Sequence, residues 1–245
     1  GGLSNEGVLV VNPEGTNQEV ELRGDPAGGA VTGEGTIRLN AVGQLNTAVL
    51  GGFGGGELFR IGVHQTIVGR GTIERARIEG RLDPGDQGQN AAEIHLESGF
   101  MEFGPTSTIS LDVYSLSSFD RLTGNDATID LDGTLELHLR GGYVPSVGDS
   151  FLVLDARRHS TSLTTIREPV INGKSFRVTV TDGDVEAIWT CLSDSNADGI
   201  LAPNDFNAWI LAFNNDAPPC DQNGDGECRP NDFNAWVLNF NSGCP

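Results

Sequence analysis

Two acidic segments near the C-terminus hold the residues whose types and spacing could bind a metal ion. Segments 194–214 and 221–241 align without a gap and are identical at 14 of 21 positions. Each places oxygen-bearing side chains at positions 1, 3, 5 and 12 and a glycine at position 6. The alternate side chains converge on one point, the glycine permits a sharp turn, and the carbonyl at position 7 and the carboxylate at position 12 complete the ligand shell. The predicted ligands are Asp194, Asn196, Asp198, Ile200 and Asp205 in the first loop and Asp221, Asn223, Asp225, Glu227 and Asp232 in the second.

The ligand set favours Ca²⁺, with one ion in each loop. Carboxylate, amide and carbonyl oxygens suit a hard cation that takes about six to eight oxygen ligands, whereas Mg²⁺ demands a tighter octahedral geometry. For a single loop, an Asp- and Asn-rich turn without metal is the simpler alternative. Because the spacing occurs twice in tandem, with a helix predicted after each copy, the sequence predicts two calcium ions.

A short helix is predicted directly after each loop. Pro203 and Pro230 lie where the first turn of a helix tolerates proline. Apolar side chains then follow at a spacing that places them in one stripe along each helix. The stripes consist of Phe206, Trp209, Ile210 and Phe213 in the first helix and of Phe233, Trp236, Val237 and Phe240 in the second. We expect the two stripes to pack on each other as the core of this small region.

The sequence before about Trp189 has a different character and predicts a β domain. Short runs such as "GTIRLNA" and "ATIDLDGTLELHL" carry apolar residues at every second position between Gly, Asn, Asp or Pro, which is typical of strands and turns. No window in this part carries a convincing helical stripe. The sequence therefore predicts a mainly β protein with a β domain over residues 1–189 and a small α domain over residues 190–245.

A weak repeat within the β domain suggests how its strands are arranged. The segment Val31–Leu39 ("VTGEGTIRL") reappears 36 residues later as Ile67–Arg75 ("IVGRGTIER"), and Leu131–Leu137 ("LDGTLEL") is a looser third copy. Such a repeat corresponds to two coils of about 18 residues, in the range of β-solenoid rungs, which must stack to bury their apolar sides. The spacing favours a β-solenoid, and a β-sandwich is the alternative.

Residues Phe119–Ala156 resemble the terminal rungs of secreted autotransporter-type β-helix proteins, which often carry a D-x-L…G…L-x-G-T-L…G-Y-x-P-x-x-G-D-x-F pattern. The matching residues are Asp120, Leu122, Gly133, Thr134, Leu135, Gly142, Tyr143, Pro145, Gly148, Asp149 and Phe151. The resemblance extends roughly from Gly104 to Trp189 and implies a β-solenoid similar to the right-handed β-helices. It implies little about activity, because this fold serves adhesins, lyases and scaffolds alike.

The C-terminal region, from Cys191 to Cys244, resembles the dockerin-like module at the end of large secreted proteins of planctomycete-type bacteria. A loop followed by a helix, twice, with Asp at position 12, departs from the full helix-loop-helix EF-hand. In cellulosomal dockerins, a Ser-Thr pair at positions 10 and 11 often helps to contact a cohesin partner. This chain has Pro203-Asn204 and Pro230-Asn231 there. The resemblance thus implies a cohesin-like partner, but the missing pair argues against one and leaves a near-symmetric surface for another partner.

All four cysteines lie in this C-terminal region, at positions 191, 220, 228 and 244. An even number in a small region predicts disulfides and an oxidising, extracellular setting. Reduced core cysteines are the alternative, and a zinc site is disfavoured because no CxxC occurs and every histidine lies outside this region. The helices of a dockerin-like module run antiparallel, so the resemblance implies the pairs Cys191–Cys244, as a clasp of the module's ends, and Cys220–Cys228, around the second loop. These are one of three pairings that four cysteines allow.

The charge of the chain limits its partners. With 34 acidic and 15 basic residues, the net charge of −19 argues against nucleic acid and anionic membranes and favours cation binding. No run of 18 apolar residues occurs that would span a membrane. Because the sequence lacks an initiator Met and a signal peptide, we expect a mature or excised product of a secreted, extracellular protein, located in solution or at the cell surface.

The sequence contains no recognisable catalytic constellation. Its acidic residues form no evident catalytic pair, its four histidines are isolated, and no G-x-S-x-G or Walker motif occurs. We therefore predict a non-catalytic structural or adhesive protein that binds two Ca²⁺ and acts in cell-surface attachment, matrix building or self-assembly into a filament. Its partner would be a second copy or a surface or matrix protein, with a glycan as a further candidate. The alternative is a polysaccharide-degrading β-helix enzyme, a lyase or glycoside hydrolase, anchored by the dockerin-like module.

Overall fold

The computed structural model describes residues 2–13, 18–24, 29–41, 47–52, 57–85, 90–97, 99–181 and 184–243, with backbone alone for 125–126, 157–162, 164 and 218. Strands make up 52% of the chain, which confirms the predicted mainly β class. The strands are β1 (Gly2–Ser4), β2 (Val8–Val11), β3 (Glu19–Arg23), β4 (Ala30–Thr32), β5 (Thr36–Asn40), β6 (Thr47–Gly51), β7 (Phe59–Ile61), β8 (Thr66–Glu74), β9 (Ala76–Ile78), β10 (Arg81–Pro84), β11 (Glu93–Leu96), β12 (Gly99–Phe103), β13 (Thr108–Ser115), β14 (Ser118–Phe119), β15 (Arg121–Leu139), β16 (Ser150–Arg167), β17 (Lys174–Val180) and β18 (Asp184–Cys191). The helices are α1 (Pro203–Asn214), the 3-10 turn η1 (Pro218–Cys220) and α2 (Pro230–Ser242).

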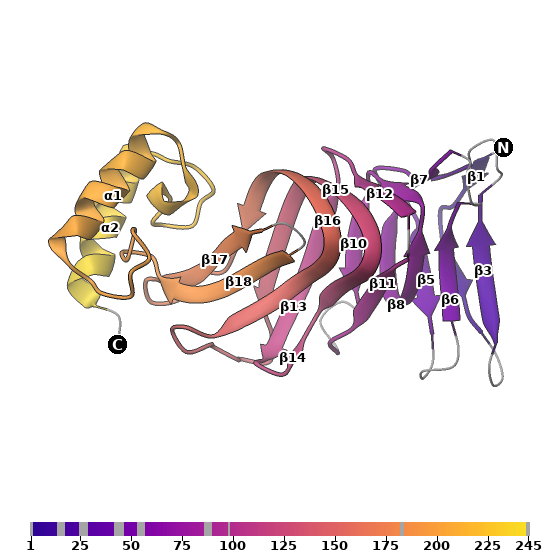
Figure 1. The fold of residues 1–245 in the computed structure, drawn as a ribbon, viewed down its shortest axis with the longest axis horizontal. Coiled ribbons are helices and arrows are strands. Elements are labelled where there is room, and N and C mark those ends of the chain that lie inside the picture. The colour runs from indigo at the N-terminus through magenta and orange to yellow at the C-terminus, as the bar shows by residue number, and fades with distance from the viewer. Residues whose placement is uncertain are drawn as a thin grey trace.

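The strands wind into a β-solenoid of about five turns (Figure 1). Successive turns pair in parallel and form three faces. Face A contains β2, β5, the first half of β8, β10, β13 and the end of β15. Face B contains β3, β6, the second half of β8, β11, the start of β15 and part of β16. Face C contains β1, β4, β7, β9, β12, the middle of β15 and part of β16. This parallel stacking rules out the antiparallel β-sandwich.

The solenoid is held together by ladders of apolar side chains that point inward. On face A, Ile37, Ile67, Leu82, Ile109 and Leu135 lie at equivalent positions of five successive strands. Each of these side chains is at most 4% exposed. Strand side chains alternate between the two sides of a sheet, so the intervening residues face outward. The alternation read in the sequence is therefore the alternation between core and surface.

The length of a turn differs from the prediction. On face A, Thr36 pairs with Thr66, and Thr108 pairs with Thr134. The number of residues between equivalent positions of successive turns therefore varies, and it differs from the predicted coil of half the 36-residue repeat. The predicted pair of equal short coils is therefore wrong as a description of the repeat. The first and second sequence copies do not stack along their whole length, because Thr72 of the second copy lies on face B opposite Val49. The looser third copy reaches face A, where Thr134 pairs with Thr108. The 36-residue spacing thus relates segments whose equivalent residues lie partly on different faces of the solenoid.

The C-terminal end of the solenoid is closed by an antiparallel hairpin. Strand β18 pairs with both β16 and β17 in antiparallel fashion. An edge-to-face series of rings runs from Phe119 to Phe151, Phe176 and Trp189, with centroids 5.4, 5.7 and 4.9 Å apart. Aromatic pairs in this geometry add stability beyond their buried area. The series covers the apolar core where the parallel ladders end.

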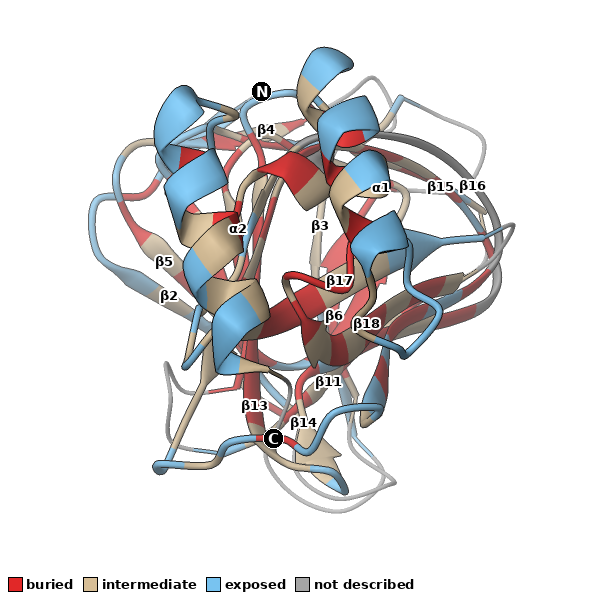
Figure 2. Cartoon of the chain, turned by 90° about the vertical axis from the view of Figure 1, so that its left-hand side faces the viewer, coloured by how far each residue is buried: buried red, intermediate tan, exposed pale blue. Residues whose placement is uncertain are grey.

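The two helices lie at the same end as this hairpin, with exposed residues on their outer sides (Figures 1 and 2). They begin at Pro203 and Pro230, as predicted. Trp209 and Trp236 are buried, and Phe206 contacts Trp236 at 5.1 Å between ring centroids. The predicted stripes are not wholly core, however, because Ile210 and Phe233 are 38% and 42% exposed. No helix in the described residues combines the length and the apolar character needed to cross a membrane.

Replacing Ile67 by alanine should lower the free energy of unfolding of the solenoid by about 2–5 kcal/mol, because it leaves a cavity in the face A ladder. Thr66→Ala is the matched control, since Thr66 is the outward neighbour and only partly buried. Chemical denaturation followed by circular dichroism measures both. Equal effects of the two variants would contradict the assignment of inward and outward positions.

Candidate functional site

The first acidic loop connects β18 to α1 and folds around its own side chains. The carboxylate of Asp194 accepts hydrogen bonds from the backbone N–H groups of Asp198 and Gly199, at 3.2 and 3.0 Å. The side-chain oxygen of Asn196 accepts a second bond from the N–H of Asp198, at 2.9 Å. Asp198 in turn accepts a bond from the N–H of Ile200, at 2.8 Å. The side-chain oxygens at positions 1, 3 and 5 are thus turned into the loop.

The second loop connects η1 to α2 and repeats these four bonds. Asp221 accepts hydrogen bonds from the N–H groups of Asp225 and Gly226, at 3.3 and 2.8 Å. Asn223 accepts a bond from Asp225 at 2.9 Å, and Asp225 accepts one from Glu227 at 3.0 Å. The two segments therefore share a conformation as well as a sequence. The glycine at position 6 has a positive φ in both, 80° for Gly199 and 84° for the second loop.

The aspartate at position 12 connects each loop to the helix that follows. Asp205 is fully buried, and its carboxylate accepts N–H bonds from Asn196 at 3.3 Å and from Ala202 at 2.8 Å. Asp232 is also fully buried and makes the corresponding bonds to the third and ninth residues of its loop, at 3.2 and 2.8 Å. Because the second of these bonds caps the helix N-terminus, this carboxylate has a structural role in addition to its predicted role as a ligand.

Each loop contains three aspartates, but among the described residues neither trio brings its carboxylates within 4.8 Å of one another. Among the described residues of the two loops, Arg229 and Glu227 form an ion pair, which does not involve an aspartate. The N–H bond from Ile200 is the largest influence on Asp198 and lowers its pKa. At Asp221, burial is the largest influence and raises the pKa. The charges of Asp232 and Asp225 add to this rise, and a bound cation would offset their repulsion of Asp221.

The donor chemistry of the loops fits a hard cation. Their side-chain donors are carboxylate and amide oxygens, which are the ligands that Ca²⁺ takes in proteins. All the predicted side-chain ligands lie within one hydrogen-bonded loop in each copy. Ile200 and Glu227, predicted to act through their carbonyls, occupy the matching seventh positions and donate their N–H groups to the fifth residue. The donor types therefore suit Ca²⁺, and the binding of two ions stays a prediction.

The cysteines of the module are oxidised as far as the structure describes them. Cys220 and Cys228 form a disulfide, with Cα atoms 5.5 Å apart, as predicted for the second loop. Asp216 lies beside the two sulfur atoms, but a disulfide offers no thiolate to a metal. Cys191 is also in a disulfide. Its predicted partner, Cys244, lies outside the described residues, so this pairing stays a prediction.

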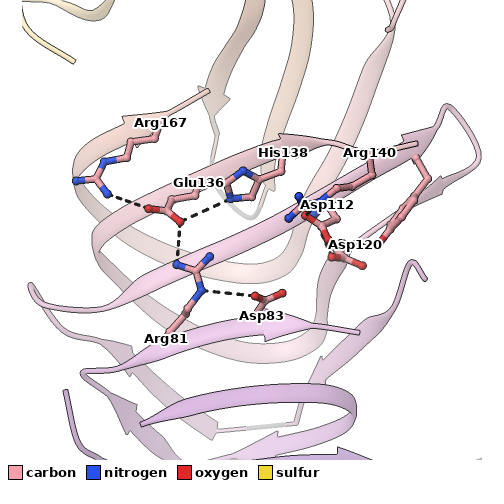
Figure 3. A network of polar contacts seen from close by, with 9 residues as sticks. Arg81, Asp83, Asp112, Asp120, Glu136, His138, Arg140 and Arg167 are labelled. Carbon is pink, nitrogen blue, oxygen red and sulfur yellow. Dashed lines mark hydrogen bonds and ion pairs between the residues drawn. The ribbon is translucent and has the colours of Figure 1, made fainter. Parts of the chain in front are cut away.

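A separate polar network covers the outer side of face A (Figure 3). Glu136 on β15 accepts hydrogen bonds from Arg81 and Arg167 at 2.8 and 2.9 Å, and its carboxylate lies 3.6 Å from Nε2 of His138. Burial raises the pKa of Glu136, but the bonds from the two arginines outweigh it and lower the pKa overall. The carboxylate is thus held in its charged form by basic residues from neighbouring turns.

Beside this network, three aspartates form a buried cluster that the sequence did not indicate. Carboxylate oxygens of Asp83, Asp112 and Asp120 lie within 4.8 Å of one another, and all three residues are buried. Burial raises the pKa of Asp120 to about 7, against the lowering effect of N–H bonds from Asp112 and Ala92. Burial likewise raises the pKa of Asp83. Asp112 and Asp120 are joined locally, at the hairpin of β13 and β14, whereas Asp83 comes from the preceding turn and is brought to them by the register between turns.

In comparisons with known proteins, no family model, no curated protein and no solved structure matches the chain. Its function is therefore inferred from its own residues and their geometry.

Gly199→Ala should lower the free energy of unfolding of the C-terminal module by about 1–2 kcal/mol. An added Cβ would meet no atom within 4 Å, so the strain of a positive φ is the whole effect. The reverse change, Ala197→Gly, should raise stability by up to about 1 kcal/mol, since Ala197 has a φ of 60°. Denaturation followed by tryptophan fluorescence measures both variants. A stabilising Gly199→Ala would show that the loop does not hold this conformation in solution.

Proposed function

We propose that this chain is an extracellular, non-catalytic structural or adhesive protein whose dockerin-like module binds two Ca²⁺ ions through loops 194–205 and 221–232. The observation that carries the proposal is the matching set of hydrogen bonds that turns the oxygens of both loops inward. The oxidised cysteines support the extracellular setting.

The loops are joined to the end of the solenoid, which gives metal binding a mechanical role. Arg177 on β17 donates a hydrogen bond to the backbone carbonyl of Asp194, the first residue of loop one, at 2.6 Å. Gln222, the second residue of loop two, donates to the carbonyl of Leu192 at 2.6 Å. Loop one is thus bonded to β17, and loop two to the residue that follows β18. A bound cation would fix these contacts and hold the module on the solenoid.

Self-association is supported by the opposite end of the solenoid. Strands β1, β2 and β3 each pair with one neighbouring strand among the described residues, which leaves their other edges open. Leu3, Val8 and Val10 are 44%, 64% and 49% exposed at this end. Open strand edges beside apolar side chains favour stacking of solenoids. A second copy or a surface or matrix protein is therefore the proposed partner.

Asp194→Asn and Asp221→Asn should each remove one bound Ca²⁺ from the full-length protein, because each neutralises the first carboxylate of one loop. Asp216→Asn is the matched control, an exposed aspartate of the same module that is outside both loops. Calorimetric titration of each variant and the native chain counts the ions. At a Ca²⁺ concentration about a hundred times the dissociation constant, each site should add about 2.7 kcal/mol to stability. An unchanged ion count in both loop variants would refute the loop sites.

Removal of Ca²⁺ with EDTA should weaken association of the protein. With a net charge of −19, neighbouring copies repel each other, and bound or bridging Ca²⁺ lowers that repulsion. Light scattering during chelation measures the particle size, and chelation followed by excess Ca²⁺ is the control for reversibility. An unchanged size would count against assembly. Ca²⁺-dependent cleavage of an acidic polysaccharide by the same sample would favour the polysaccharide-degrading enzyme instead.

A further inference from the structure

The structure points to a third cation site, in the solenoid itself and independent of the two loops. We propose that Asp83, Asp112 and Asp120, together with the hydroxyl of Ser110, bind a hard divalent cation of the size of Ca²⁺. The site lies beside the network of Figure 3, on the outer side of face A. It is formed by side chains from β10, from β13 and from the residue that precedes β15.

The spacing of the carboxylates matches the diameter of a calcium shell. The ligand oxygens of the three aspartates lie within 4.8 Å of one another. Oxygens bind Ca²⁺ at about 2.3–2.6 Å, so two ligands on opposite sides of the ion lie up to about 5 Å apart. Around Mg²⁺, at about 2.0–2.1 Å, the same limit is about 4.2 Å. One Ca²⁺ can therefore be reached by all three carboxylates without moving the strands.

Ser110 is the independent sign that a ligand is needed here. Its side chain is 1% exposed, and its hydroxyl has no hydrogen-bond partner among the described residues. Ser110 is two residues before Asp112 on β13, so the two side chains face the same side of the strand. The register between β13 and β10 pairs Ile109 with Leu82, and continued by one residue it would place Ser110 beside Asp83. A buried hydroxyl without a partner costs free energy, and a cation at this place would satisfy its oxygen.

The charges around the cluster are not balanced by the protein. Arg140 donates to Asp112 at 2.7 Å. Arg81 reaches Asp83 only at 3.5 Å, while it bonds Glu136 at 2.8 Å. Asp120 has backbone N–H donors, from Ala92 at 2.7 Å and from Asp112 at 3.0 Å, and no ion pair among the described residues. Buried carboxylates are stable when a charge of opposite sign compensates them, and a divalent cation would supply that charge.

An open space next to the cluster gives the ion a way in. A cavity of about 440 Å³ is lined in part by Gly85, Ala92 and Ser118. Each of these residues is close to the cluster in sequence or contact: Ala92 donates to Asp120, and the other two are each two residues from an aspartate of the cluster. The cavity thus borders Ala92, whose N–H group bonds Asp120.

Asp83→Asn tests the site with the least disturbance, because the other two aspartates hold backbone or arginine donors that an amide would oppose. In calorimetric titration of the full-length protein with Ca²⁺, this variant should bind one ion fewer than the native chain. Asp155→Asn, at an exposed strand position of the solenoid, should bind as many as the native chain. Ser110→Ala should retain the site with about tenfold weaker binding.

Terbium luminescence locates the ion. The hydroxyl of Tyr114 lies 3.3 Å from Asp112, so Tb³⁺ in the cluster would receive energy from this tyrosine. In a chain that carries both Asp194→Asn and Asp221→Asn, the sensitised emission should persist. Adding Tyr114→Phe should abolish its tyrosine component, whereas adding Tyr143→Phe should not.

The third site and the loop sites fail separately. Loss of ions in the loop variants with no loss in Asp83→Asn would overturn the third site and leave the loops standing. Loss in Asp83→Asn alone would support the third site even if the loops bind nothing. Emission that is insensitive to Tyr114→Phe would also overturn it, because the ion would then lie elsewhere.

Discussion

The register between successive turns is the constraint on which the rest of the structure depends. On face A, Ile37 lies against Ile67 and Ile67 against Leu82, and the same alignment continues through five strands. A shift of one residue would turn an apolar row outward and a polar row into the core. No turn can bury its apolar side alone, so each keeps its register because its neighbours keep theirs. The last turn on the C-terminal side has no further parallel turn to cover it. The closing hairpin, with its series of aromatic rings, covers its apolar side instead.

The register that stacks the core also sets the electrostatics of the surface. Outward residues at equivalent positions meet across turns, as Glu93 meets Arg121 with 2.6 Å between their charged atoms. At Glu136 the arrangement gives a carboxylate two arginine partners from different turns. At Asp83, Asp112 and Asp120 the same register brings three carboxylates together with fewer basic side chains to pair with them. Like charges on adjacent strands destabilise a sheet, and in a chain this acidic such places are hard to avoid. A compensating ion at such a position would stabilise it, which is the basis of the third site proposed above.

Local patterns in the sequence predicted more of this molecule than long-range ones. Alternation indicated the strands, and the prolines at 203 and 230 indicated the helix starts, because both signals act within a few residues. The turn length was wrong because the connections between faces vary: the chain from Thr66 to its partner Arg81 is half as long as the chain from Thr36 to its partner Thr66. With connections of such different lengths, the sequence has no single repeat length that corresponds to one turn. The residues of each acidic loop could be grouped in advance because all of them lie within twelve positions, and their role as metal ligands stays a prediction. The aspartate cluster could not, since only the register between turns brings Asp83 to Asp112 and Asp120. The exposed Phe233 was also missed, because two helices cannot enclose a whole apolar stripe.

The two ends of the solenoid differ in a way that bears on assembly. At the C-terminal end, β17 pairs with β18 and β18 with β16, and Arg177 of β17 bonds the first residue of an acidic loop. A change in the loop would therefore reach the last turn through paired strands. At the other end, β1, β2 and β3 present open edges far from both loops (Figure 1). A cation at the loops would thus act on one end of the molecule by fixing contacts, and on the other only by lowering the total negative charge. Contacts at the loop end should depend on the cation itself, whereas contacts at the open edges should depend on ionic strength, because screening lowers like-charge repulsion without any specific site.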